Sequence, residues 1–120
     1  MKRPPATVVV FLLALGLYAA TTHRRVFIAG NDASRWAAIE SMVDYGSASV
    51  ERSRFAANID RIRIGERDYS NKPPLLSLAG AAVYAALQAL FGWSLSGAGA
   101  ASVLYWETLL LVGVPSAWLV

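Results

Sequence analysis

NDASRWAAIE (residues 31–40) and YSNKPP (residues 69–74) decide the fold of this 120-residue chain. They bound the one long polar segment of the sequence, and apolar runs flank that segment on both sides. Asp32 stands near the start of the segment and Lys72 near its end. This pattern predicts a polar loop that apolar helices present at a membrane surface.

The composition indicates a membrane protein. Hydrophobic residues make up 56% of the chain and the mean hydropathy is +0.43, whereas soluble domains are nearer ~45–50% apolar. The net charge of +3 does not indicate nucleic-acid binding, because the cations are dispersed among acids and form no basic run. The chain has no cysteine, which excludes disulfides and zinc-thiolate sites.

The apolar runs predict an all-α membrane fold, namely a polytopic helical bundle with about three transmembrane helices. The expected spans are residues 6–22, 75–93 and 103–120, and residues 23–74 form the extramembrane loop. At ~1.5 Å per residue the first span is short for a bilayer core of ~30 Å. We interpret it as an uncleaved signal anchor rather than a cleaved signal peptide, because further spans follow and Tyr18 disrupts the small-residue cleavage pattern.

Three features of the spans carry further expectations. The third run stops without a polar flank, so we expect the N-terminal piece of a longer polytopic protein. Glu107 lies about one turn inside this run; it is either a functional acid within the membrane or a side chain that reaches the interface. Ser77, Ala81, Ala85 and Ala89 form a stripe of small residues at four-residue spacing, which predicts close helix packing.

Charge alone leaves the orientation of the loop undecided. Nine of the eleven Lys and Arg residues lie between residues 24 and 72, which by the positive-inside rule would place the loop in the cytoplasm. The rule weakens as loops approach ~60 residues, and this loop is nearly that long.

Within the loop, residues 32–44 predict a short amphipathic helix that lies along the membrane interface. Asn31 or Asp32 is its expected N-cap, and Gly46 stands where a C-terminal cap is expected. The apolar residues that share one face are Trp36, Ile39 and Val43.

The rest of the loop predicts a small hairpin and a fixed lysine. Residues 47–68 show strand-like alternation, with Ile62 and Ile64 on one face and a turn at 65–68. Lys72 directly precedes two prolines and a membrane helix, which fix it at the level of the lipid headgroups. An ammonium there either binds a phosphate or anchors the helix; the sequence leaves both readings open.

Two motifs carry a resemblance to a known family. Asp32-x-x-Arg35-Trp36-Ala37-x-Ile39, followed later in the loop by Tyr69-Ser70-Asn71-Lys72-Pro73-Pro74-Leu75, resembles the first external loop of the GT-C membrane glycosyltransferases. The protein O-mannosyltransferase and lipid A aminoarabinose transferase group is the most similar. The resemblance covers about residues 5–95. The family often has a glutamate where this chain has Ala33 and an acid where it has Asn71.

The resemblance implies a multi-pass glycosyltransferase of the bacterial cytoplasmic membrane, with the loop facing outside. Such an enzyme moves a sugar from a polyprenyl-phosphate-linked donor to a lipid, glycan or protein acceptor, with inversion and without a metal or cofactor. Asp32 would be the general base. Lys72 would bind the lipid phosphate, and Tyr69 and Arg35 would belong to the same phosphate site. The 120 residues alone would be inactive.

A second class of function stays open. The chain could be a small three-helix membrane protein that scaffolds or binds a partner without catalysis, with the loop as its docking surface.

Overall fold

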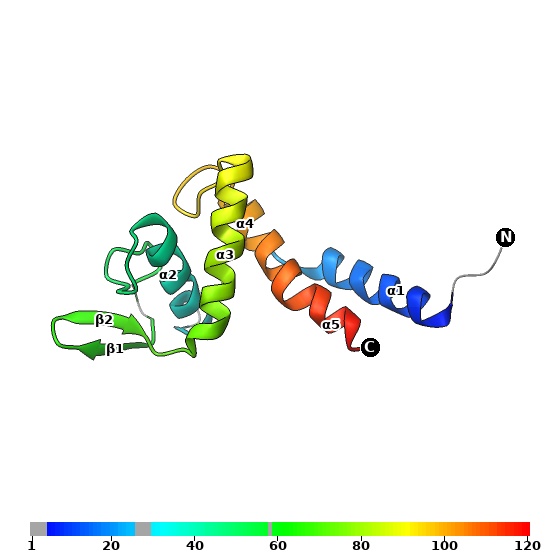
Figure 1. The fold of residues 1–120 in the computed structure, drawn as a ribbon, viewed down its shortest axis with the longest axis horizontal. Helices are drawn as coiled ribbons and strands as arrows, with labels where there is room; N and C mark the ends of the chain where they lie inside the picture. The colour runs from blue at the N-terminus through cyan, green and yellow to red at the C-terminus, as the bar shows by residue number, and fades with distance from the viewer. Residues whose placement is uncertain (1–4, 26–29, 58) are drawn as a thin grey trace.

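The computed structural model describes residues 5–25, 30–57 and 59–120. In chain order the elements are α1 (Ala6–Thr21), α2 (Gly30–Asp44), β1 (Arg61–Ile64), β2 (Arg67–Ser70), α3 (Pro74–Phe91), α4 (Ala100–Thr108), the π-helix η1 (Leu109–Gly113) and α5 (Val114–Trp118). They form an elongated molecule of 63 × 27 × 21 Å (Figure 1). The chain is mostly helical, and the two-stranded sheet corrects the expectation of an all-α fold.

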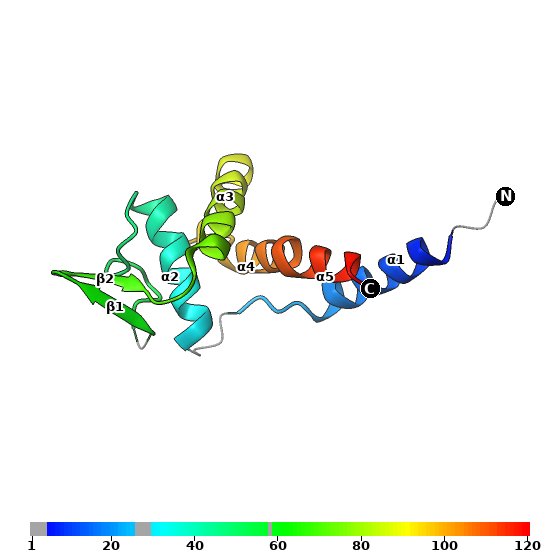
Figure 2. The same cartoon turned by 60° about the horizontal axis from the view of Figure 1, so that its bottom comes forward.

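At one end of the molecule α1 pairs with the last helical segments. α1 packs on η1 and α5. The chain direction of α1 is opposite to that of the stretch α4–α5 (Figures 1 and 2). The Tyr105 hydroxyl donates a hydrogen bond to the Ala19 carbonyl (3.0 Å), while the Phe11 and Trp118 rings meet edge to face with centroids 5.9 Å apart. These contacts join the end of α1 to α4 and the start of α1 to α5, which fixes the antiparallel pairing.

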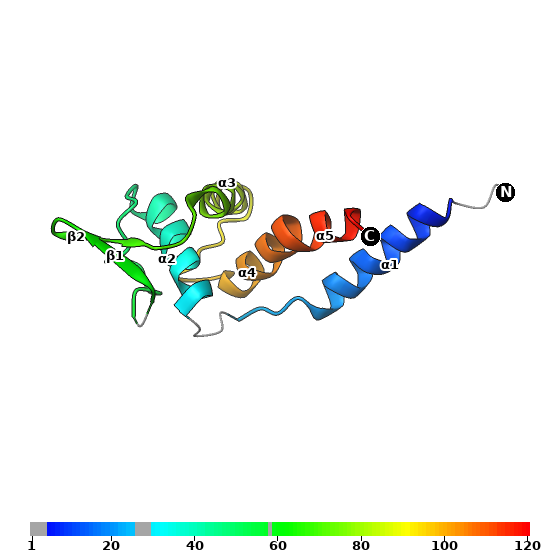
Figure 3. The same cartoon turned by 90° about the horizontal axis from the view of Figure 1, so that it is seen from below.

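At the other end α3 lies crosswise to this pair. Figure 3 shows α3 nearly end-on, while α1 and α4–α5 are seen along their lengths. Two glycines with left-handed backbone turn the chain between α3 and α4: Gly92 with φ 66° and Gly99 with φ 82°. The three apolar helices therefore do not form one parallel bundle, which corrects that part of the predicted architecture.

In the part of the chain that the structure describes, two helical segments are long and apolar enough to cross a membrane: α3 with 18 residues and the continuous stretch Ala100–Trp118 with 19. α1 has 16 residues and is shorter. The predicted boundaries of the first two helices differ from the structure by one or two residues. The third helix begins three residues earlier than predicted, at Ala100, directly after the turn at Gly99.

α2 occupies the centre of the polar end rather than its surface. Ile39 packs with Tyr84, Leu87 and Leu104 in one buried cluster. Ala37 and Ala38 pack with Val50 in a second cluster on another side of the helix. The predicted apolar face is therefore too narrow, because α2 also buries three residues with polar side chains: Ser34, Glu40 and Ser41.

Buried Glu40 holds the loop that follows α2. Its Oε2 accepts hydrogen bonds from the Ser53 hydroxyl (2.5 Å) and the Arg54 amide (2.8 Å). The Arg54 guanidinium in turn donates to the Leu95 carbonyl, in the loop between α3 and α4. Polar contacts thus join the chain after α2 to the far end of α3.

α2 and α3 lie side by side along their lengths. Near the middle, a Cβ added at Gly80 of α3 would lie 2.6 Å from Ile39 Cδ1 of α2. Near the end, the Tyr84 hydroxyl donates to Asp44 Oδ1 (2.9 Å) and Gln88 Nε2 donates to the same oxygen (3.0 Å). A bilayer that surrounded α3 would therefore surround α2 as well. The sequence predicts that α2 lies at the membrane interface and that α3 crosses the membrane. Both cannot hold, because the two helices lie side by side.

The small-residue stripe predicted on α3 is wrong as a packing surface. The buried residues of α3 are Ser77, Gly80, Tyr84 and Leu87. Of the predicted stripe only Ser77 is among them, while Ala85 and Ala89 are exposed. The difference arises because α3 packs against α2 and α4 on one side only, and Gly80 gives the close approach there.

The predicted hairpin is confirmed. β1 and β2 pair antiparallel, with Ile62 opposite Tyr69 and Arg63 opposite Asp68. The turn is shorter than predicted, because Arg67 and Asp68 already belong to β2, and Gly65 supplies its positive φ of 63°. Two hydrogen bonds from Arg63 to Asp68 (2.8 and 3.1 Å) hold the pKa of the Asp68 carboxyl below its usual value.

The last helix contains a π-helical turn directly before Pro115. Pro115 has no amide hydrogen, so the carbonyl one turn before it has no α-helical donor. In η1 the Val114 amide donates to the Leu109 carbonyl, five residues back. The helix widens there without breaking.

Candidate functional site

A cleft of about 160 Å³ lies where the α1/α5 pair meets the α2/α3 end of the molecule. Its walls come from the chain after α1, the first turns of α2 and α3, and the segment α4–η1. The lining residues are His23, Arg25, Asp32, Arg35, Trp36, Ile39, Leu76, Leu104, Glu107, Thr108, Leu111 and Val112.

The structure brings two of the predicted site residues into this cleft, Asp32 and Arg35. α2 begins at Gly30, so Asp32 lies in the first helical turn and is not its N-cap. Asp32 and Arg35 are three residues apart, which places both on one side of the helix. Asp32 is exposed, whereas Arg35 is half-buried and its Nε has no hydrogen-bond partner among the residues that the structure describes.

Glu107 lines the same cleft from α4. It is only 2% exposed, and its Oε1 lies against the backbone of Gly80, where a Cβ would collide with it. Oε2 is buried and has no hydrogen-bond partner within the described part of the chain. The structure therefore rules out the expectation that this side chain reaches solvent at the interface.

Apolar residues form most of the other walls of the cleft, beside His23, Arg25 and Thr108. Trp36 and Ile39 come from α2, and Leu76 comes from the first turn of α3. Leu111 and Val112 come from η1, so the widened turn itself shapes the cleft. The cleft combines cations, carboxylates and hydrocarbon, a set that suits an amphiphile with an anionic, hydroxyl-bearing head.

Lys72 lies outside the residues that line the cleft. Its Nζ is 3.1 Å from Asp60 Oδ2, and its side chain is 15% exposed. The Lys72 amide donates to Ser70 Oγ (3.3 Å), which shares a hydrogen bond with Ser34 Oγ (2.7 Å). Ser34 also donates to the Asp60 carbonyl (2.7 Å). This network ties the base of the hairpin to the first turns of α2.

Tyr69 also lies away from the cleft walls. It stands in β2 opposite Ile62 and forms an isolated bridge with Ser49. Its position is that of a strand residue in the hairpin.

Sequence reasoning missed Asp60 as the partner of Lys72. The two residues are twelve positions apart and meet only because the hairpin brings its two ends together. Glu107 was recognised as unusual because an acid interrupts an apolar run. No sequence signal placed it beside Asp32 and Arg35.

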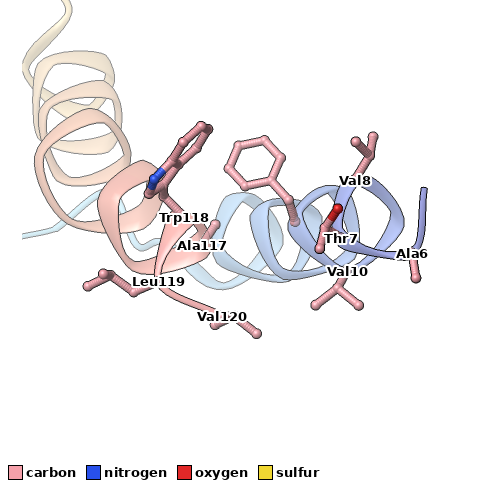
Figure 4. Close-up of a pocket in the computed structure, with 9 residues that line it drawn as sticks. Ala6, Thr7, Val8, Val10, Ala117, Trp118, Leu119 and Val120 are labelled. Atoms are coloured by element: carbon pink, nitrogen blue, oxygen red, sulfur yellow. The ribbon is translucent and has the colours of Figure 1, made fainter. Parts of the chain in front are cut away.

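A larger cavity of about 690 Å³ lies at the opposite end of the molecule, between the start of α1 and the end of α5 (Figure 4). Among the described residues its walls are apolar apart from Thr7, and none of them carries an ionisable side chain. We place the candidate functional site in the smaller cleft, because of these two cavities the smaller one gathers described groups able to move protons or hold a charge.

No protein family, curated protein or solved structure matches this chain. Its function is therefore inferred from the residues of the cleft.

Proposed function

We propose that the chain forms part of a membrane glycosyltransferase of the GT-C type. The enzyme moves a sugar from a polyprenyl-phosphate-linked donor to a lipid, glycan or protein acceptor at the outer face of the bacterial cytoplasmic membrane. One observation carries the proposal: Asp32 and Arg35, the two charged residues of the first motif, line one cleft together with apolar helix residues.

Asp32 is the general base in this proposal. Its carboxylate takes the proton from the acceptor hydroxyl as the hydroxyl oxygen attacks the anomeric carbon, and the bond from that carbon to the phosphate oxygen breaks. A positioned base contributes ~10²–10⁴-fold to such a step. Its position in the first turn of α2 exposes the carboxylate to an incoming acceptor.

Arg35 binds the phosphate of the donor. A guanidinium is suited to phosphate because its N–H groups form a planar fork. Apolar residues beside it, such as Leu76 and Leu111, offer a surface for the first isoprene units of the lipid.

Lys72 and Tyr69 have more distant roles in the proposal. Lys72 stabilises the phosphate leaving group after exchanging its contact with Asp60 for the phosphate oxygens. Tyr69 keeps the hairpin, and through it the Lys72 backbone, in register with α2.

Sugar transfer in membranes that carry the complete natural protein tests the proposal. We expect Asp32→Asn to lower transfer by ~10²–10⁴-fold, because the amide cannot take a proton. Glu66→Gln makes the same carboxylate-to-amide change in the exposed hairpin turn and should leave transfer unchanged. Transfer by Asp32→Asn at more than half the wild-type rate would remove Asp32 from catalysis. Absence of sugar transfer by the wild-type protein would favour the alternative function, that of a membrane protein that scaffolds or binds a partner without catalysis.

A further inference from the structure

Two side chains that line the same cleft each bury one polar atom that has no partner among the described residues. Arg35 Nε and Glu107 Oε2 form no hydrogen bond with any described residue, and both side chains line the cleft. Native proteins satisfy nearly all buried polar atoms, because an unmade hydrogen bond there is costly. The coincidence of two such atoms in one cleft indicates that a ligand supplies the missing partners.

The two atoms suit different partners. The Arg35 Nε–H is a donor and needs an acceptor, whereas a hydroxyl group can pair with the Glu107 carboxyl in either protonation state, because a hydroxyl both donates and accepts. A phosphate oxygen satisfies the first atom and a hydroxyl satisfies the second. A glycosyl phosphate carries both groups within one small head.

The walls around the two atoms indicate which part of the ligand lies where. Arg35 is joined at the cleft by Arg25, so positive charge gathers on the side of α2 and the chain before it. Glu107 comes from a different helix, α4, and its Oε1 lies beside Gly80 of α3. A carboxylate repels phosphate, but it accepts hydrogen bonds from hydroxyl groups.

We propose that Glu107 is the sugar-binding residue of the cleft. Its free carboxylate oxygen accepts a hydrogen bond from a hydroxyl of the sugar whose phosphate Arg35 holds. This assignment rests on the proposed function, since it takes the lipid-linked sugar as the ligand. It makes Glu107 a determinant of which sugar is bound, separate from the base and from the phosphate contact.

Equilibrium binding to the purified chain in lipid nanodiscs tests the assignment. The probes are polyprenyl phosphate without sugar and three polyprenyl phosphates that carry glucose, mannose or arabinose. We expect at least one glycosylated probe to bind the wild type more tightly than the bare lipid. In Glu107→Gln that advantage should fall by ~10-fold, because an amide replaces the carboxyl group that pairs with the sugar hydroxyl.

The bare lipid and a matched variant separate the outcomes. Affinity for polyprenyl phosphate should be unchanged in Glu107→Gln and reduced in Arg35→Gln. Glu66→Gln should behave as the wild type with every probe. The assignment is overturned if no glycosylated probe exceeds the bare lipid, or if Glu107→Gln keeps the sugar advantage or loses affinity for both lipids equally. Unchanged lipid binding in Arg35→Gln contradicts the proposed function instead.

Discussion

Gly80 decides how closely three helices meet beneath the cleft. It lies on α3 where the side chains of Ile39 from α2 and Glu107 from α4 both occupy the space that a Cβ would need. Any larger residue must displace both of them. The packing of Glu107 in the cleft therefore depends on the absence of a side chain at one position of a neighbouring helix.

We expect Gly80→Ala to destabilise the protein by ~1–3 kcal/mol, since an added methyl in a tightly packed site forces its neighbours to move. Thermal unfolding in detergent measures the change. Gly16→Ala is the matched control: Gly16 also lies in an apolar helix, but no atom lies within 4 Å of its added Cβ. That variant should be neutral or slightly more stable. Equal destabilisation of both variants would contradict the role of the contacts at Gly80, because Ala at an uncrowded helical position should not destabilise.

At the scale of residues, local spacing predicted part of the candidate site. Asp32 and Arg35 share a cleft because positions three apart on a helix share a side, which the sequence shows directly. The contact of Lys72 with Asp60 and the approach of Glu107 to Gly80 join segments from different elements. Such contacts depend on how the elements pack against one another. The periodicity of a single sequence does not show this packing.

At the scale of elements, the hairpin is held by charge. Arg61 and Arg63 both reach the Asp68 carboxylate, at 3.2 and 2.8 Å. The Glu51 carboxylate accepts a hydrogen bond from the Asp68 amide (2.6 Å). Residues 61–64 are exposed, so apolar burial contributes little on that strand. The hairpin therefore depends on the ionised form of Asp68.

The pH dependence of the hairpin follows from the lowered pKa of Asp68. Its stabilising contribution should be complete above the unfolded-state value of ~4 and should be lost as the pH falls through the lower folded-state pKa. NMR amide shifts of Ile62 and Tyr69, followed from pH 7 downward, measure the loss. Asp68→Asn should remove the pH-dependent stabilisation that the Asp68 carboxylate supplies. It should keep the hydrogen bond from the amide of residue 68 to Glu51. Identical pH profiles for the variant and the wild type would contradict the role of Asp68.

The type of each helix or strand was largely predictable from the sequence, but which of its residues are buried was not. The alternation around Ile62 and the turn-forming residues at 65–68 predicted the hairpin, which the structure contains. The apolar residues of α2 predicted a helix, but not that Ser34 and Glu40 would be buried. Their burial depends on hydrogen bonds to Asp60 and to the loop at Ser53. Those partners come from segments that the helical period does not describe.

At the scale of the whole molecule, the contacts of α3 set how the chain meets a membrane. α3 has α2 along one side, while Leu75, Leu78 and Leu90 are exposed on it. α1 buries none of its residues and pairs with η1 and α5. An arrangement in which α1 and the stretch Ala100–Trp118 cross the bilayer, while α2 and α3 lie at its surface, satisfies every one of these contacts.

Cysteine labelling tests this arrangement, and the absence of native cysteine makes each introduced thiol unique. We expect Ala48→Cys and Ser96→Cys, both at exposed positions, to react with an impermeant maleimide from outside intact cells. The Arg54 contact with Leu95 places their two loops on one side. Val120→Cys, at the far end of α5, should react only after lysis. Labelling of residues 48 and 96 from opposite sides would show that α3 crosses the membrane.

The π-helix η1 has a consequence for the phase of the last helix. Before it, α4 turns Val103 and Glu107 toward the interior; after it, α5 turns Ala117 inward beside α1. One residue more per turn rotates everything downstream by ~100° relative to an unbroken α-helix. The π-helix therefore rotates the inward face of α5, which contains Ala117, relative to the inward face of α4, which contains Val103 and Glu107. Deleting one residue within Leu109–Gly113 would swing the face that meets α1 away while leaving Glu107 where it is.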